Sequence, residues 1–206
     1  MRIYQHFSVV GFCNTYVVGE KQGGEAILID PGHVDNELIS IIEQNNYIIS
    51  TILLTHRHES HTRGVGTLLK LYKPTIYAYT SKVYDFKVIE IAGNSKINCG
   101  GIEVETIHLP GHSVDSLVYK IGHALFTGDT LMATRIGSTP GYIERSILIK
   151  IIREKLLNFD ENLIVFPGHG APTKIKNEIL FNPDLTEETV SPWLRNQMKQ
   201  ERNNRF

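Results

Sequence analysis

The stretch Thr55-His56-Arg57-His58-Glu59-Ser60-His61 places three histidines within six positions, directly after an apolar run that begins at Ile48. This run has the length and composition of a buried strand. In extended chain leaving a strand, side chains two positions apart point the same way, so His56 and His58 can bind one metal ion together. His61 lies where the next helix is expected to begin and can face the same space. The spacing therefore predicts a metal site at the end of this strand.

Three further segments each combine an apolar strand with a turn of small residues and a polar side chain. Glycine beside a metal ligand lets the backbone approach without a Cβ clash, and a strand that ends in such a turn presents the next side chain at the rim of a sheet. One such turn alone would equally fit an ordinary glycine turn with a surface polar residue. Three of them behind a histidine cluster predict further ligands at His112, Asp129 and His169. The segments are Leu109-Pro110-Gly111-His112-Ser113, Leu125-Phe126-Thr127-Gly128-Asp129-Thr130 and Val165-Phe166-Pro167-Gly168-His169-Gly170.

The rest of the chain mixes strand-like and helix-like segments, which predicts a single domain over 1–185 and a polar helical tail over 186–206. Helices are expected after Asp35, through Leu68 to Leu71, and over 144–157, with one buried face on the last of these. That face comprises Ile147, Leu148, Ile151, Ile152, Lys155 and Leu156. Strands are expected over 2–10, 15–19, 26–29, 48–55, 75–79, 102–109, 116–121, 124–127 and 163–166.

Composition limits the class of protein. Hydrophobic residues make up 41% and charged residues 21% of the 206 positions, which is typical of globular proteins. The net charge of -1 argues against binding nucleic acid or an anionic membrane through bulk charge. Two cysteines without a C-x-x-C motif predict neither a disulfide framework nor a zinc knuckle. No apolar run approaches the roughly 20 residues of a membrane helix. We expect a cytoplasmic protein whose partner is a small-molecule substrate; the oligomeric state stays open.

Five motifs in this order resemble the metallo-β-lactamase fold superfamily, and the likeness covers roughly residues 3 to 180. Among its members, the chain is most similar to short glyoxalase II-like (hydroxyacylglutathione hydrolase-like) hydrolases. The resemblance implies an αββα sandwich of two mixed β-sheets flanked by helices, with the metal site at one edge between the sheets. The motifs are Asp30-Pro31-Gly32, Thr55-His56-Arg57-His58-Glu59-Ser60-His61, Pro110-Gly111-His112, Gly128-Asp129-Thr130 and Pro167-Gly168-His169-Gly170.

The resemblance also implies roles for individual residues. His56, His58 and His112 would bind a first metal ion, Asp129 would bridge two ions, and His61 and His169 would bind the second. Zinc is the expected metal, with iron or manganese as alternatives. Asp129 and His112 are expected to be indispensable for turnover, which would be hydrolysis of a thioester or ester by a metal-activated water.

Two segments depart from the family pattern. The usual motif is H-x-H-x-D-H, and here Ser60 replaces the aspartate, so a neutral hydroxyl stands where the second metal usually has a carboxylate. Glu59 is a weak substitute because neighbouring side chains on an extended turn point in different directions. We therefore expect one strong and one weak metal site. Gly137-Ser138-Thr139-Pro140 stands where related hydrolases often have Gly-Arg-Thr-Asp, so that arginine and that aspartate are absent.

Two alternatives to a hydrolase remain open. Persulfide dioxygenases share the implied fold, and His56, His112 and Asp129 would form the two-histidine, one-carboxylate set that suits a single non-haem iron. Ser60 matters less in that case, because only one metal is required. The other alternative is a degenerate, non-catalytic domain that binds a metal or another ligand.

Overall fold

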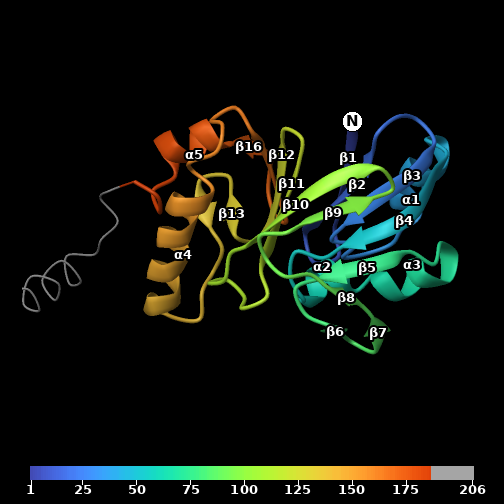
Figure 1. Cartoon of the computed structure of the whole chain (residues 1–206), viewed down its shortest axis with the longest axis horizontal. Coiled ribbons are helices and arrows are strands. Elements are labelled where there is room, and N and C mark those ends of the chain that lie inside the picture. Colours follow the sequence, from blue (N-terminus) through green and yellow to red (C-terminus); the bar gives the residue numbers. More distant parts are fainter. Residues whose placement is uncertain (187–206) are drawn as a thin grey trace, which may run out of the picture.

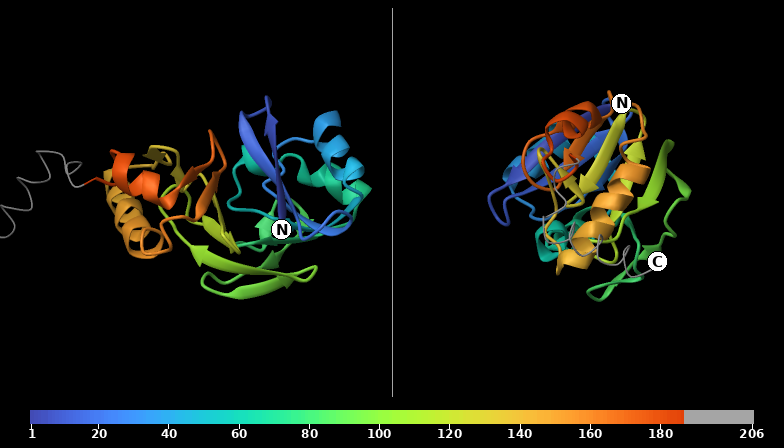
Figure 2. Two further views of the ribbon diagram at one scale, coloured as in Figure 1. Left: turned by 90° about the horizontal axis from the view of Figure 1, so that it is seen from above. Right: turned by 90° about the vertical axis from the view of Figure 1, so that its left-hand side faces the viewer.

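The computed structural model describes residues 1–186 and shows two six-stranded β-sheets packed face to face, with helices on both outer faces (Figures 1 and 2). This arrangement confirms the αββα sandwich. The first sheet has the strand order β1-β2-β3-β4-β5-β8. Its strands are β1 Arg2–Ser8, β2 Cys13–Gly19, β3 Gly24–Ile29, β4 Tyr47–Leu53, β5 Thr75–Ala78 and β8 Ile89–Glu90.

The second sheet has the strand order β16-β15-β12-β11-β10-β9, and two small hairpins accompany the two sheets. Its strands are β9 Lys96–Cys99, β10 Ile102–His108, β11 Leu117–Ile121, β12 Ala124–Gly128, β15 Ile164–Pro167 and β16 Thr173–Lys174. The hairpins are β6 Lys82–Val83 with β7 Phe86–Lys87, and β13 Leu131–Met132 with β14 Arg135–Ile136.

The helices are α1 Asn36–Gln44, α2 Glu59–Thr62, α3 Val65–Leu71, α4 Tyr142–Lys155 and α5 Ile175–Phe181. Helices α1 and α3 cover the outer face of the first sheet, and α4 lies on the outer side of the second (Figure 2). Asp35 caps the N-terminus of α1: its side chain accepts a hydrogen bond from the Leu38 amide and so satisfies one free N–H of the first turn. No helix within residues 1–186 is long and apolar enough to cross a membrane.

The layer between the sheets is a buried core of aromatic and aliphatic side chains. Tyr16 of the first sheet packs edge-on against Phe126 and Phe166 of the second, with ring centroids 5.3 and 5.4 Å away. Such pairs add about 0.5–1.5 kcal/mol to the burial of their area. The Tyr16 hydroxyl also donates to the carbonyl oxygen of Pro167, which ties the sheets together close to the end of β15.

The long apolar strands lie where the sequence predicts them, with ends that differ by at most two residues. The buried face expected for helix α4 needs a correction. Leu148, Ile152 and Leu156 are fully buried, whereas Lys155 is exposed and Ile147, which is 45% exposed, lies outside the core. The sequence did not predict the two-residue strands, β9 or α5. The tail expected over 186–206 lies, from residue 187 onward, outside the described residues.

The topology brings the predicted ligands to one edge of the sandwich. Strands β12 and β15 are parallel, and β10 and β12 both pair antiparallel with β11, so all three run in the same direction. Their carboxyl ends precede His112, Asp129 and His169. In the first sheet, β3 and β4 are parallel and end before Asp30 and His56. Residues far apart in the sequence therefore meet where these strands end.

Candidate metal centre

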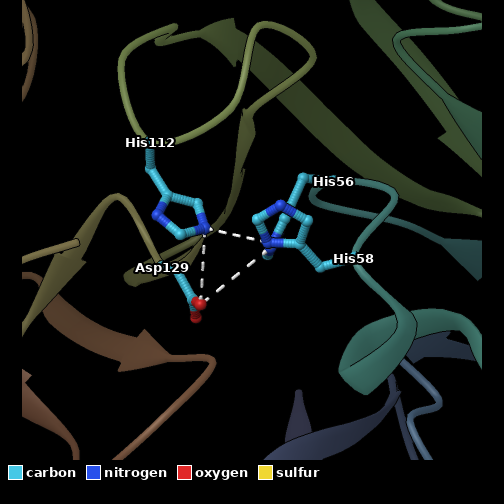
Figure 3. A group of neighbouring side chains, drawn as sticks. All are labelled: His56, His58, His112 and Asp129. Atoms are coloured by element: carbon cyan, nitrogen blue, oxygen red, sulfur yellow. Dashed lines mark hydrogen bonds and ion pairs between the residues drawn. The ribbon is translucent and has the colours of Figure 1, made fainter. Parts of the chain in front are cut away.

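Four side chains form what we call the first ligand group: His56, His58, His112 and Asp129 (Figure 3). One ligand atom from each lies within 4.8 Å of all the others. The Nδ1 atom of His58 is 3.0 Å from Nε2 of His56 and 3.1 Å from Nε2 of His112. The Oδ2 atom of Asp129 is 3.6 Å from His112 Nε2 and 3.9 Å from His56 Nε2. The four residues come from three separate strand ends.

The second ligand group comprises His61, Asp129 and His169, whose ligand atoms also lie within 4.8 Å of one another. His61 Nε2 is 3.4 Å from Asp129 Oδ1, and His169 Nε2 is 3.5 Å from Asp129 Oδ2. Asp129 therefore belongs to both groups, as a bridging ligand requires. All six predicted ligands occur in one cluster or the other.

Asp30 orients one histidine of each group. Its backbone has a positive φ of 50°, and its carboxylate accepts the amide of Thr55 at 2.8 Å and the Thr55 hydroxyl at 2.7 Å. It also accepts Nδ1–H of His61 at 3.1 Å. Because the Thr55 hydroxyl has given its hydrogen to Asp30, it accepts from Nδ1 of His56, 3.0 Å away. Both rings are thus held with Nε2 free to face the site.

Two backbone carbonyl groups orient the rings of His112 and His169. His112 Nδ1 lies 2.7 Å from the carbonyl oxygen of Ser138, and His169 Nδ1 lies 2.7 Å from that of Phe12. A carbonyl oxygen can only accept, so each Nδ1 carries the hydrogen and each Nε2 presents a lone pair. The sequence could not predict these partners, because any residue type supplies a carbonyl.

The donor atoms of the first ligand group fit a bound cation. His56 and His112 both present Nε2 lone pairs toward Nδ1 of His58, which as a neutral ring can donate at most one hydrogen to one of them. At least one close nitrogen–nitrogen contact therefore has no hydrogen between its atoms. A metal ion would accept all three lone pairs, and the histidine and carboxylate set suits zinc, iron or manganese.

The second ligand group passes a similar test. His61 Nε2 and Asp129 Oδ1 are both buried, and neither makes a hydrogen bond within residues 1–186, since their 3.4 Å separation is at the long limit. Buried polar atoms without partners are rare and call for an explanation. Gly168 leaves the necessary room, because a Cβ there would stand 2.5 Å from His61 Cε1 and 2.6 Å from Asp129 Oδ1. A cation between the two atoms would satisfy both.

Neither residue before His61 supplies a carboxylate to the cluster. Glu59 is exposed and forms an ion pair with Arg63, 2.7 Å away and directly after the same short helix. Ser60 lies against the loop between β1 and β2, with its Cβ 3.2 Å from where a Cβ on Gly11 would stand. The second ligand group therefore has two histidines and one shared carboxylate.

The two groups differ in electrostatics. Burial, together with the neighbouring His61, lowers the pKa of His56 to about 2, so its ring is neutral at any working pH. Burial and His112 likewise lower the pKa of His58. For His61 burial acts in the same direction, but the carboxylates of Asp30 and Asp129 outweigh it and raise its pKa to about 10. Burial by itself raises the pKa of Asp129, yet the neighbouring His61 ring, whose Nε2 lies 3.4 Å from Oδ1, holds that pKa well below its usual range.

A family model described as the metallo-beta-lactamase superfamily matches residues 8–89 and 84–169, which span both ligand groups. The chain belongs to this superfamily. Within the metallo-beta-lactamase superfamily, an uncharacterized protein of Mycobacterium tuberculosis strain H37Rv is 32% identical over 208 residues, covering 84% of this chain and 92% of the relative.

Two more distant relatives carry the names of hydrolases. A probable polyketide biosynthesis zinc-dependent hydrolase, BaeB, of Bacillus velezensis is 26% identical and covers 85% of this chain and 84% of its own length. A hydroxyacylglutathione hydrolase of Methylobacillus flagellatus is 25% identical and covers 81% of this chain and 66% of its own length. Together with the family, these relatives support a metallo-hydrolase.

Solved structures of the superfamily have the same fold. The BLEG-1 B3 metallo-beta-lactamase superposes with a TM-score of 0.80 at 26% identity, over 90% of this chain and all of that one. ETHE1 from Myxococcus xanthus superposes with a TM-score of 0.79 at 25% identity, over 89% of this chain and 84% of that one. The order and spacing of the sequence motifs thus identified both the superfamily and the fold.

Proposed function

We propose that the protein is a metal-dependent hydrolase of a small thioester or ester. The observation that carries this proposal is the pair of ligand groups joined by Asp129, in which the oriented histidines present lone pairs to common points. The hydrolase names of the relatives in Bacillus velezensis and Methylobacillus flagellatus favour the same reaction class. A bound divalent metal would polarise the acyl carbonyl group and lower the pKa of a water molecule.

One carboxylate and two backbone carbonyl groups hold the histidine ligands in place before substrate binds. Asp30, Ser138 and Phe12 fix ring orientations through the Nδ1 atoms, so no ligand must reorganise when substrate arrives. His56 stays neutral at working pH because of its lowered pKa, which keeps Nε2 available as a ligand. The carboxylate of Asp129 supplies the negative charge that both ligand groups share.

We further propose that the two metal sites are unequal and that zinc is the preferred metal. The first ligand group has three histidines and a carboxylate, whereas the second has one ligand fewer. Ser60 brings no charge to the second group. Removing a carboxylate next to a divalent cation removes an attraction of a few kcal/mol even at the effective dielectric constant of a partly buried site. One tightly bound metal and one weakly bound metal are the expected loading.

The test measures metal content and hydrolysis on the same preparations, purified without a chelating tag. Metal-stripped protein and protein reloaded with one and then two equivalents of zinc would be assayed on a panel of short acyl thioesters with a thiol-trapping dye. We expect hydrolysis to depend on zinc. The His123→Ala variant, which removes an exposed histidine outside both groups, should behave as wild type.

Two results would contradict the proposal. One tightly bound iron per chain, with oxygen consumption and no thioester hydrolysis, would favour the mononuclear oxygenase built on His56, His112 and Asp129. Binding of no metal at all would identify a degenerate domain. In either case the hydrolase assignment would be wrong.

A further inference from the structure

The segment that carries His56 and His58 is attached to the opposite sheet at three successive points. Each attachment joins the chain after β4 to β11 or to the residue two positions before it. The three partners on that side are Asp115, Leu117 and Tyr119, which alternate along the chain. The hydrogen bonds are Tyr119 Oη to the Leu54 carbonyl at 2.7 Å, the Leu117 amide to the Thr55 carbonyl at 2.7 Å, and the Arg57 amide to Asp115 Oδ2 at 3.1 Å. These bonds hold the segment after β4, which carries His56 and His58, against the chain that leads from His112 into β11.

Asp115 differs from the other two attachments because it uses a carboxylate. The amide that it accepts belongs to Arg57, which stands between His56 and His58 in the chain. Its other oxygen accepts a hydrogen bond from the hydroxyl of Ser113, the residue after His112. One carboxyl group therefore contacts both segments that supply histidines to the first ligand group.

The charge of Asp115 is also unusual. The residue is only 5% exposed, and within the described part of the chain it forms no ion pair with a lysine, arginine or histidine. Its partners are one amide and one hydroxyl, both of which are neutral. Burying a carboxylate without a counter-charge is costly. A divalent cation in the first ligand group would supply the missing positive charge.

We propose that Asp115 is a positioning residue for the first metal: it locks the His56–His58 segment to the His112 loop and places a negative charge behind them. This inference rests on the proposed function only in requiring that the first ligand group binds metal. Asp115 itself is not a ligand, since it does not belong to either group of converging donor atoms.

The test is the Asp115→Asn variant, which keeps the size of the side chain but removes its charge and turns one acceptor into a donor. Partners of this kind typically contribute 10–100-fold to metal affinity. We expect the Kd of the tighter zinc, measured by competition with a chromophoric chelator, to rise about 10–100-fold. Visible spectra of the cobalt-loaded protein should show altered geometry, and hydrolysis should recover toward the wild-type rate when zinc is in excess.

Two further variants supply a matched control and a milder perturbation of Asp115. Asp160→Asn removes an exposed carboxylate that also accepts a backbone amide, that of Asn162 at 2.9 Å, and should leave zinc affinity unchanged. Ser113→Ala removes one of the two hydrogen bonds to Asp115 and should weaken zinc binding by a smaller factor. It also provides a measurement should Asp115→Asn fold poorly. Thermal melting of the metal-free variants gives the purely structural effect.

The outcomes separate this inference from the proposed function. Zinc affinity within about threefold of wild type in both Asp115→Asn and Ser113→Ala would overturn the role of Asp115. So would a loss of activity that excess zinc fails to restore. Wild-type protein that binds no metal would overturn the proposed function instead, before any variant is compared.

Discussion

The two halves of the metal cluster use the same kind of ligand in opposite electrostatic settings. In the first ligand group, burial among other histidines lowers the pKa values of His56 and His58. In the second, His61 lies between the carboxylates of Asp30 and Asp129, which raise its pKa to about 10. A histidine ligand is thus neutral in one half and protonated in the other before metal arrives.

This difference shows why ligand identity alone does not set metal affinity. The first ligand group binds a cation without releasing a proton from His56, whereas the second must first lose the proton of His61. Ser60 adds to the asymmetry, because the second group lacks the carboxylate that would offset this cost. The comparison predicts a hierarchy of effects, of which loss of the shared carboxylate should be the largest.

Replacing Asp129 with alanine should weaken metal binding by both ligand groups at once. Asp129 is the one carboxylate common to the two ligand groups, so its removal leaves neutral and protonated histidines facing one another. We expect hydrolysis to fall about 10³-fold or more and metal content to fall below one equivalent. Elemental analysis and initial rates measure both effects, with His123→Ala as the control. If Asp129→Ala retained two metal ions, Asp129 would not be a ligand that both sites share.

Single histidine variants should separate the halves. Removing His56 or His112 takes a ligand from the tighter site, and we expect hydrolysis to fall by about 10²–10³-fold even at high zinc. Removing His61 should spare the first metal and lower the stoichiometry from two to one. Titration of each variant with zinc against a chelator measures this difference. Equal losses at both sites in all three variants would mean that the two groups act as one undivided site.

The pH dependence of the second metal follows from the raised pKa of His61. The pKa of His61 is about 10, so at lower pH the ring holds a proton that the metal must displace. The affinity of the second site for metal therefore falls as the pH falls. Between pH 9 and pH 7 we expect the Kd of the second metal to rise about tenfold per unit. Because the pKa of His56 is lowered, this residue adds no pH dependence to the Kd of the first metal over the same range.

Calorimetry in buffers of different ionisation enthalpy would count the protons released, which should approach one for the second metal. The Asp30→Asn variant sharpens the comparison, because Asp30 is the leading cause of the raised pKa and its loss should flatten the slope. Equal pH slopes for the two metals would contradict the assigned difference.

The sequence predicted which side chains would lie together better than it predicted their surroundings. His56, His58 and His61 share one segment, and the resemblance assigned them to two metal sites. The physical cause of that division appears only in the structure, where α2 begins at Glu59 and His61 Nδ1 lies 3.1 Å from Asp30 Oδ2. Carbonyl partners such as that of Ser138 carry no residue signature. Asp115 lay unnoticed beside a predicted ligand because an isolated aspartate in a loop is usually exposed.

Fold prediction succeeded where periodicity was strong. The long strands were found from their apolar runs, whereas β6, β7 and β8 have two residues each and show no period to detect. Helix α4 was placed correctly, but its buried stripe is narrower than its apolar composition suggests, since Ile147 faces away from the core. Composition alone does not distinguish a buried isoleucine from an exposed one.

The smallest effect concerns Ser60, whose replacement by aspartate would restore the usual family motif. Gly11 has no side chain, which leaves room beside Ser60 Cβ, and the added carboxylate would stand next to His61 in the chain. An attraction of a few kcal/mol between close charges, reduced by solvent exposure and by the proton on His61, corresponds to about tenfold tighter binding of the second metal.

Ser40→Asp, which adds the same charge on the exposed side of α1, is the matched control. Zinc stoichiometry and thioester hydrolysis of both variants would be measured beside wild type. A gain in Ser60→Asp alone would identify the missing carboxylate as the cause of the asymmetry. No gain would mean that the second site is limited by the proton on His61, in which case raising the pH should strengthen it and the serine should not matter.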